Sequence, residues 1–141
     1  MTTNKVKKLN PYNSKLSNHW GTPKELYDSL NEEFSFNYEA CKAHSTIDDL
    51  LTEWGSSNFL NPPYSAIESF AKKAVEEQKK GRTTVMLIPA RTSTKYFHKY
   101  ILPNAEIRFI EGRLKFVGLC ESNKNSKGPA GFASILCIFR G

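Results

Sequence analysis

The sequence predicts an α/β fold in which helices flank a mainly parallel sheet, with antiparallel strands at its C-terminal end. Short apolar segments alternate along the chain with segments in which apolar residues recur every three or four positions. One short segment, TTVMLIP at 83–89, is almost entirely apolar, as is typical of a strand buried on both faces of a parallel sheet. The closely spaced strands expected after it favour antiparallel pairing. A chain of 141 residues, 39% of them hydrophobic, has the size of one domain.

The N-terminal segment does not share this pattern. Residues 1–18 contain several lysines and few apolar anchors, so we expect a flexible basic leader followed by a single domain over 19–141. The sequence has neither a long apolar run nor the hydrophobic core of a signal peptide, and we therefore expect a cytoplasmic protein with no membrane span. Its cysteines and histidines lack the spacing of metal ligands, which predicts reduced thiols and no metal site.

The first helix is predicted from its start signal. Thr22, Pro23 and Glu25 occupy the N-cap, first and third helical positions of a capping box. The helix should run to about Phe34, because apolar residues recur at steps of three and four along it.

Two strands and a connection are expected next. The segment FSFNYEAC predicts a short strand that ends at 39–41. The acidic, turn-rich segment at 44–57 predicts a connection with one helical turn. The segment NFL at 58–60 is then a short buried strand, and two prolines follow it directly.

The second helix also begins with a predicted capping box. Ser65 and Glu68 have the required spacing, and Gly81 is expected to end the helix. The apolar face is predicted to consist of Ile67, Phe70, Ala71, Ala74 and Val75.

The C-terminal third is predicted to contain one helix and three strands. The helix spans about 93–101, and its aromatic residues and isoleucine lie on one apolar face. The segments EIRFI, RLKFV and FASILCIF are expected to be strands, with ESNKNSKGPAG as a flexible basic loop before the last.

The charge balance narrows the class of partner. Twenty basic residues against 14 acidic ones give a net charge of +6 and a pI near 9.2, which favours a polyanion. Nucleic acid is the first interpretation, a membrane surface is the second, and a merely soluble basic protein remains open.

The motif Asn61-Pro62-Pro63-Tyr64 is the strongest chemical signal. Ligands of open α/β sheets bind beyond the carboxyl ends of strands, where this motif is expected to lie. Each proline has a fixed φ and no backbone N–H, so the loop is stiff and its carbonyls are predicted to escape local amides. The side-chain carbonyl of Asn61, the carbonyl of Pro62 and the ring of Tyr64 then suit a planar group that carries an NH₂.

Such a pair of acceptors has a catalytic use. An exocyclic amine such as adenine N6 is a poor nucleophile, because its lone pair is delocalised into the ring. Two acceptors that hold its hydrogens favour a pyramidal nitrogen, which can attack a methyl sulfonium without a metal or a strong base. A base from a duplex must be flipped out, and stacking on Tyr64 offsets part of the cost. The alternative is a proline-rich turn that opens a helix.

Beyond this motif, several ordered blocks follow one another over roughly residues 19–140. They run from HWGTPKELYDSLNEEFSFNYEAC through DDLLTEWGSSNFLNPPYS, VMLIPARTSTKYF and EIRFIEGRLKF to GFASILCIF. Together these blocks resemble the phage and prophage family of DNA N6-adenine methyltransferases. This resemblance implies a Rossmann-like methyltransferase fold, S-adenosylmethionine as cofactor and transfer of a methyl group to adenine N6 in DNA. The catalytic residues it implies are Asn61, Pro62, Pro63 and Tyr64.

The resemblance also implies a cofactor pocket. Trp20, Thr22 and Pro23 match its W-x-T-P block, and Glu39 stands where the family usually has Asp at a strand end. The implied cofactor-binding residues are Trp20, Thr22, Pro23, Glu39, Ala40, Cys41, Asp49 and Asn61. A helix cap for Thr22 and an exposed connector carboxylate for Asp49 are the structural alternatives.

Basic residues near strand ends suit DNA phosphates. The predicted contacts are Arg91, Arg113, Lys115, Lys124 and Lys127, with solvated surface charge as the alternative. The chain leaves little room for a separate recognition domain, so specificity is expected from short loops or from a partner subunit in a homo-oligomer. Methylation of an RNA base or a protein glutamine, and a nucleic-acid-binding protein without catalysis, are the alternative functions.

Overall fold

The computed structural model describes residues 20–42, 47–118 and 130–141. The predicted leader and most of the predicted basic loop, with Cys120, Lys124 and Lys127, lie outside the described residues.

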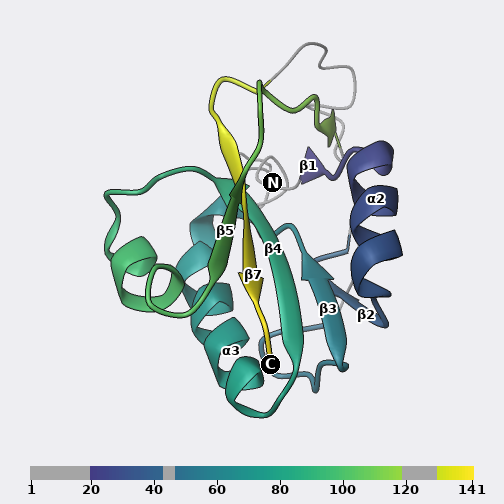
Figure 1. Ribbon diagram of the computed structural model, residues 1–141, viewed down its shortest axis with the longest axis vertical. Helices are drawn as coiled ribbons and strands as arrows, with labels where there is room; N and C mark the ends of the chain where they lie inside the picture. Colours follow the sequence, from purple (N-terminus) through teal and green to yellow (C-terminus); the bar gives the residue numbers. More distant parts are fainter. Residues whose placement is uncertain (1–19, 43–46, 119–129) are drawn as a thin grey trace, which may run out of the picture.

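A five-stranded sheet forms the centre of the molecule (Figure 1). Its order is β2 (Tyr38–Ala40), β3 (Ser57–Leu60), β4 (Thr83–Pro89), β7 (Ser134–Phe139) and β5 (Glu106–Phe109). Strands β2, β3 and β4 pair in parallel, whereas β7 is antiparallel to both β4 and β5. Of these five strands, β7 alone is reversed. The predicted α/β class and the antiparallel pairing near the C-terminus are confirmed.

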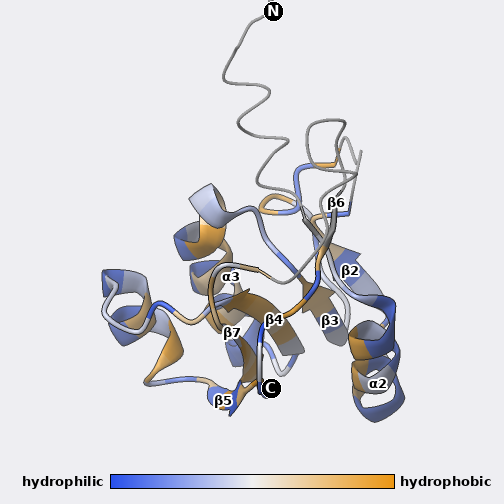
Figure 2. Cartoon of the chain, turned by 90° about the horizontal axis from the view of Figure 1, so that it is seen from above, coloured by the Kyte–Doolittle hydropathy of each residue, from blue (hydrophilic) through white to orange (hydrophobic). Residues whose placement is uncertain are grey.

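Two helices cover opposite faces of the sheet (Figure 1). Helix α3 (Ile67–Lys79) packs on one face and α2 (Lys24–Phe34) on the other. Strand β4 serves both, because successive side chains of a strand point to opposite faces. Met86 belongs to the α3 side and Val85 to the α2 side, and Figure 2 shows the hydrophobic colour of β4 and β7 between the helices.

The apolar periodicity of α3 is confirmed. Ile67, Phe70, Ala71 and Ala74 are buried, and Val75 is partly buried against the same cluster. Gly81, just beyond the C-cap, has a φ of +85°, a conformation that glycine adopts without strain.

The helix expected over 93–101 is shorter and wider than predicted. It consists of a helical turn followed by η2 (Phe97–Ile101), a π-helical segment in which the Leu102 N–H donates to the Phe97 carbonyl at 2.8 Å. Phe97 and Ile101 are buried and Tyr96 and Tyr100 pack beside them, so the predicted apolar face is present.

The strand predicted at RLKFV is wrong for residues 113–116, which are irregular. The short strand β6 (Val117–Gly118) follows them and pairs with β1 (Trp20–Gly21) in a separate two-stranded sheet. The Leu114 carbonyl accepts a hydrogen bond from the Ala130 N–H at 2.8 Å, so this segment pairs outside the central sheet.

The connection before β3 contains no helix among residues 47–56. A hydrogen-bonded turn from Asp48 to Leu51, 3.0 Å between N and O, takes the place of the predicted helical turn. None of the helices that the described residues form is long and apolar enough to cross a membrane.

Candidate active site

The Asn-Pro-Pro-Tyr motif lies directly after the last residue of β3, at the carboxyl end of the strand. Leu60 pairs with Ala40, the last residue of β2, and with Met86 of β4, so β2 and β3 end side by side while β4 continues for three residues to Pro89. Pro62 is buried and Pro63 is extended, with φ −57° and ψ 140°. The motif is therefore at the position expected for a ligand site in an open α/β sheet.

The chain enters α3 through a short 3₁₀ turn, η1 (Tyr64–Ala66). The Ala66 N–H donates to the Pro63 carbonyl at 2.9 Å, so the prediction that local amides leave both prolyl carbonyls alone is wrong for Pro63. The predicted Ser65–Glu68 capping box is also wrong, because Ala66 is the N-cap and no side chain caps the helix. Ser65 lies inside the 3₁₀ turn, one residue before the N-cap of α3.

Asn61 is joined to the segment before α2. Its Nδ2 donates to the Thr22 Oγ1 at 3.2 Å, which links residues 39 positions apart. The capping box predicted at Thr22 and Glu25 is wrong, since Pro23 is the N-cap and the helix has no side-chain cap bond. The Thr22 hydroxyl accepts a hydrogen bond from Asn61 in place of the predicted cap bond to the start of α2.

Tyr64 is half-buried against aromatic rings from the C-terminal part of the chain. The centroids of the Tyr64 and Phe132 rings lie 5.5 Å apart, and the ring planes meet edge to face at 88°. The centroid of the Phe116 ring lies 6.2 Å from that of Phe132. Burial raises the pKa of the Tyr64 phenol to about 12, while the charge of Arg91 opposes the rise. Arg91 is thus within electrostatic reach of the motif.

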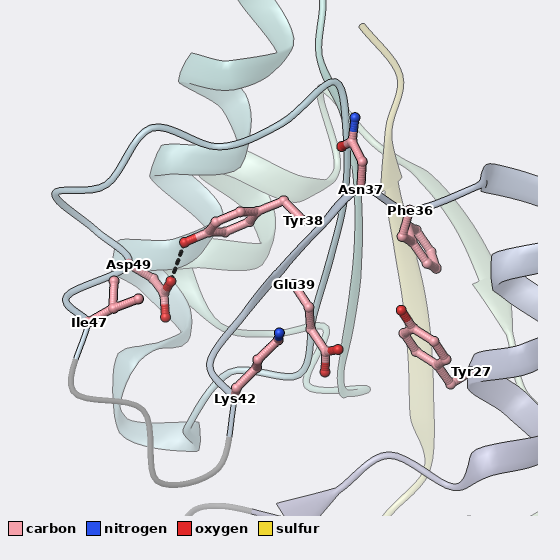
Figure 3. Close-up of a pocket in the computed structure, with 8 residues that line it drawn as sticks. All are labelled: Tyr27, Phe36, Asn37, Tyr38, Glu39, Lys42, Ile47 and Asp49. Atoms are coloured by element: carbon pink, nitrogen blue, oxygen red, sulfur yellow. Dashed lines mark hydrogen bonds between the residues drawn. The ribbon is translucent and has the colours of Figure 1, made fainter.

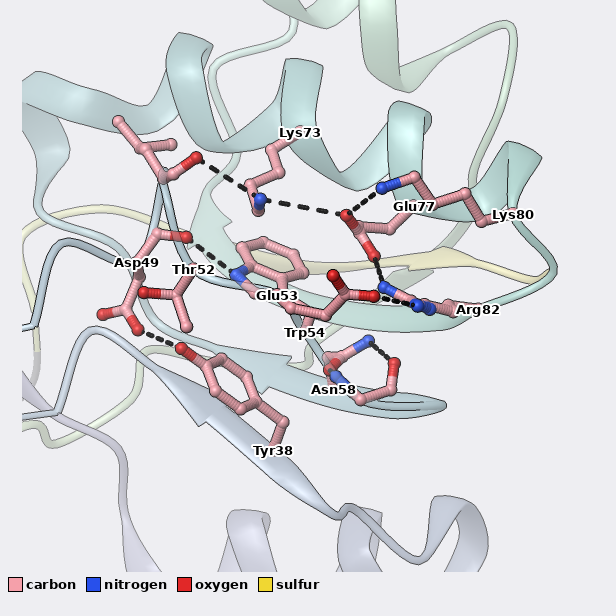
Figure 4. A network of polar contacts seen from close by, with 12 residues as sticks. Tyr38, Asp49, Thr52, Glu53, Trp54, Asn58, Lys73, Glu77, Lys80 and Arg82 are labelled. Atoms are coloured by element: carbon pink, nitrogen blue, oxygen red, sulfur yellow. Dashed lines mark hydrogen bonds and ion pairs between the residues drawn. The ribbon is translucent and has the colours of Figure 1, made fainter.

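The turn after β2 has an unusual backbone. Cys41 has a φ of +62°, and its N–H donates to the Asp49 Oδ2 at 2.9 Å. The other carboxylate oxygen of Asp49 accepts the Tyr38 hydroxyl, and the Asp49 backbone carbonyl accepts the Trp54 Nε1 at 2.8 Å (Figure 4). Asp49 is only 8% exposed, so the alternative of an exposed connector carboxylate is wrong.

A pocket of about 360 Å³ opens beside β2 (Figure 3). Burial raises the pKa of the Glu39 carboxyl, and Lys42 opposes this rise. Burial also raises the pKa of the Tyr27 phenol, and the charge of Glu39 adds to this second rise. Figure 3 shows the Glu39 carboxylate between Lys42 and Tyr27. The lining residues are Tyr27, Phe36, Asn37, Tyr38, Glu39, Lys42, Ile47 and Asp49.

The comparison with known proteins agrees with this geometry. A family model described as DNA N-6-adenine-methyltransferase (Dam) matches residues 11–141. The chain belongs to this family. The "DNA N-6-adenine-methyltransferase" of Escherichia phage T1 is 35% identical over 109 residues, which cover 67% of this chain and 45% of the phage protein. The match thus spans less than half the length of that Dam-family relative.

The structure brings the predicted site residues of this Dam-family chain together in two groups. Glu39 and Asp49 line the pocket, whereas Asn61 and Thr22 form the hydrogen-bonded pair beyond β3. The groups are adjacent, because Cys41 and Asn61 each follow one member of the Ala40–Leu60 pair. Ala40 is buried, and Trp20 lies in β1 two residues before Thr22.

The predicted DNA-contacting residues follow strand ends. Arg91 is exposed two residues after β4, and its N–H donates to the Pro89 carbonyl at 2.9 Å. Arg113 and Lys115 are exposed in the irregular segment before β6. The described residues contain no cluster of three or more His, Cys, Asp or Glu that could hold a metal ion.

Sequence reasoning missed Phe116, Phe132 and Lys42. Phe132 precedes β7 by two residues and was predicted as part of a strand, yet its ring contacts Tyr64 from a bend. No local pattern distinguishes such an aromatic residue from one in the core. Of the cysteines the structure describes, Cys41 and Cys137 are free thiols, as predicted.

Proposed function

We propose that this chain transfers a methyl group from S-adenosylmethionine to the N6 amine of adenine in DNA. Membership of the Dam family supports the reaction, and the phage T1 relative carries the name of that activity. The observation that carries the proposal is the Asn-Pro-Pro-Tyr motif at the carboxyl ends of the parallel strands β2 and β3, beside β4, with Asn61 bonded to Thr22.

Asn61 and Pro62 supply the two acceptors for the target amine. The Pro63 carbonyl accepts the Ala66 N–H, so the Asn61 Oδ1 and the Pro62 carbonyl are the pair that we assign to the amine hydrogens. Both are stronger partners for the amine as positive charge develops on its nitrogen, which stabilises the transition state. No strong general base is needed before the new N–C bond forms.

Tyr64 provides the stacking surface for an extruded adenine. The edge contact with Phe132 restrains its ring. With the pKa of the phenol raised to about 12 by burial, the side chain stays neutral at working pH and adds no charge beside the methyl acceptor. Its role is therefore that of a flat, rigid platform.

The pocket beside β2 suits the cofactor in size, because cofactor sites are concave and measure about 300–1,000 Å³. Its lining combines aromatic rings with charged side chains. Glu39 is the polar group that we assign to a cofactor ammonium or hydroxyl, and Asp49 shapes the wall through its bonds to Tyr38 and Cys41. Bound there, S-adenosylmethionine supplies an electrophilic methyl group. A single Rossmann-like methyltransferase domain over 19–141 accounts for this arrangement.

DNA is the proposed macromolecular partner. Arg91, Arg113 and Lys115 are exposed cations on the segments that follow β4 and β5, where they can meet phosphates. Lys124 and Lys127 stay predictions of the same kind. A DNA substrate places the reaction in the cytoplasm of a bacterial host, as the phage origin of the relative suggests.

The decisive experiment is methyl transfer from labelled S-adenosylmethionine to unmethylated duplex DNA, followed by nucleoside analysis. We expect N6-methyladenine. Parallel reactions with RNA and with a glutamine-containing peptide test the alternative substrates, and equal or faster transfer to either contradicts DNA as the substrate. A folded chain that binds the cofactor but modifies no DNA contradicts the reaction itself.

A further inference from the structure

The hydrogen bond between Asn61 and Thr22 connects the catalytic motif to a segment that the resemblance assigns to the cofactor. We propose that Thr22 is a positioning residue, which holds the Asn61 amide in the orientation that presents Oδ1 to the target amine. This inference rests on the proposed function. It differs from the implied role of Thr22 as a cofactor contact, because here the hydroxyl acts through Asn61.

The surroundings of Thr22 fix the place of its hydroxyl. On one side, Gly21 and Trp20 pair with Val117 and Gly118 in the β1–β6 ladder. On the other, Pro23 has a restricted φ of −56°, and its carbonyl accepts the Tyr27 N–H at 3.1 Å as α2 begins. Thr22 has a short side chain and lies between a strand and a packed helix, so its hydroxyl has little freedom to move.

The helix that follows anchors this segment to the same sheet as Asn61. Leu30 of α2 is buried in one cluster with Phe59 of β3, two residues before the catalytic motif. The helix start and the end of β3 are thus parts of one packed unit. The Thr22–Asn61 bond closes a loop between two segments that packing already holds together.

The chemistry of a primary amide explains what the bond does. The amide is planar, so a hydrogen bond at Nδ2 restrains the rotation of Oδ1 about the same axis. The bond also withdraws the Nδ2 hydrogen toward an acceptor, which increases the negative charge on Oδ1 through the conjugated amide. A chain from the amine through Oδ1 and Nδ2 to the Thr22 Oγ1 is cooperative, and it strengthens as charge develops on the amine.

Thr22→Val tests this assignment, because valine keeps the branched shape and removes the acceptor. We expect kcat for DNA methylation to fall by about 3- to 10-fold, the effect of one neutral hydrogen bond. The KM for DNA and the Kd for S-adenosylmethionine should stay near their wild-type values. Thr22→Ser retains the hydroxyl and should restore most of the activity.

Thr83→Val is the matched control. The Thr83 Oγ1 accepts from the Gly141 N–H at the same distance, 3.2 Å, but at the amino end of β4. This variant should have wild-type kcat, so a general effect of replacing a threonine hydroxyl is separated from the effect at Thr22. Thermal unfolding of all three variants shows whether lost activity is lost folding, and Thr22→Ser decides the matter if Thr22→Val unfolds.

A double-mutant cycle separates positioning from other roles. In an Asn61→Ala background, measured in single turnovers with excess enzyme, Thr22→Val should have almost no further effect, since no amide remains to orient. An equal loss in both backgrounds overturns the proposal. A raised Kd for S-adenosylmethionine with unchanged kcat also overturns it and makes Thr22 a cofactor contact.

One readout does not depend on activity. In a ¹H–¹⁵N spectrum, the Asn61 side-chain amide, assigned by its loss in Asn61→Ala, should shift in Thr22→Val and remain near its place in Thr22→Ser and Thr83→Val. An unchanged resonance in Thr22→Val contradicts the bond itself. If the wild type methylates no DNA while the spectra behave as expected, the proposed function fails and the structural link stands.

Discussion

Two asparagines lie at opposite ends of β3, and their surroundings differ. Asn58, near the start of the strand, is fully buried, and within the described residues its side chain bonds backbone groups. Its Oδ1 accepts the Gly55 N–H at 2.8 Å, and its Nδ2 donates to the carbonyls of Gly55 and Thr83 at 2.9 and 3.0 Å. Asn61, after the last residue, is half-buried and bonds the Thr22 side chain.

Charged side chains at the same end of the sheet as Asn58 form a network of ion pairs. Glu77, 1% exposed, accepts from Arg82 at 2.7 Å and from Lys80 at 3.4 Å, and Arg82 also bonds Glu53 (Figure 4). Such a network holds the connection before β3 to α3. At the carboxyl end the unusual Cys41 backbone and the stiff prolines shape a surface instead. The bonds of the first group join segments of the fold, whereas we propose that the bond of Asn61 to Thr22 orients a catalytic side chain.

Asn61→Ala should have the largest effect, and it should fall on catalysis. The variant loses an acceptor that strengthens in the transition state, so turnover should drop by about 10²- to 10³-fold with little change in unfolding temperature or cofactor affinity. Methylation kinetics and thermal unfolding measure the two quantities. Wild-type turnover in a folded Asn61→Ala protein refutes the catalytic reading of the motif.

Asn58→Ala should have the opposite profile. Three backbone groups lose their partner in a part-buried place, which should lower the free energy of unfolding by about 2–3 kcal/mol. Urea unfolding measures this loss, and methylation per folded molecule should stay at the wild-type value. A selective loss of turnover in Asn58→Ala would erase the contrast between the two ends of β3.

Tyr64 tests the stacking platform at the carboxyl end. Tyr64→Ala should weaken productive DNA binding by about 10-fold, because base–aromatic stacking contributes roughly 1–3 kcal/mol. Tyr64→Phe keeps the ring against Phe132 and should retain most of the activity. With the phenol pKa raised to about 12, both Tyr64→Phe and the wild type should have the same pH–rate profile in the neutral range. A profile that changes with the hydroxyl assigns it a proton-transfer role instead.

Glu39→Gln should have the smallest effect of these variants on stability, a slight increase at neutral pH. Burial raises the pKa of this carboxyl, so ionisation of Glu39 costs folding stability as the pH rises through its raised pKa. Glutamine removes that cost, and the variant should unfold at a slightly higher temperature than wild type at neutral pH. The difference should disappear as the pH falls below the ordinary glutamate pKa, where the carboxyl is protonated in both the folded and the unfolded state.

The same variant should lose affinity for the cofactor. Calorimetry with S-adenosylmethionine measures this, and Glu53→Gln, an exposed carboxylate of the opposite polar network, is the control. Unchanged cofactor affinity in Glu39→Gln removes Glu39 from the proposed cofactor site.

The sequence by itself determined the elements and the motif. Apolar runs predicted β4 and β7, periodicity predicted the buried face of α3, and Asn61 to Tyr64 were assigned from four adjacent residues. The predictions of β4, β7 and the buried face of α3 are confirmed, because burial acts locally, within a few residues of the position it constrains. The assignment of Asn61 to Tyr64 as catalytic residues stays a prediction. The family match extended them over most of the chain.

Only the tertiary structure decided how polar side chains are used. Thr22 and Ser65 have the spacing of helix caps, yet neither caps its helix. A hydroxyl accepts from the donor that the fold brings nearest, and for Thr22 this donor is Asn61, 39 residues away. Likewise, the Asp49 carboxylate bonds Tyr38 and Cys41, and the Phe132 ring meets Tyr64. Residue spacing in the sequence indicates which side chains can form such bonds, but the packing of distant segments determines which bonds form.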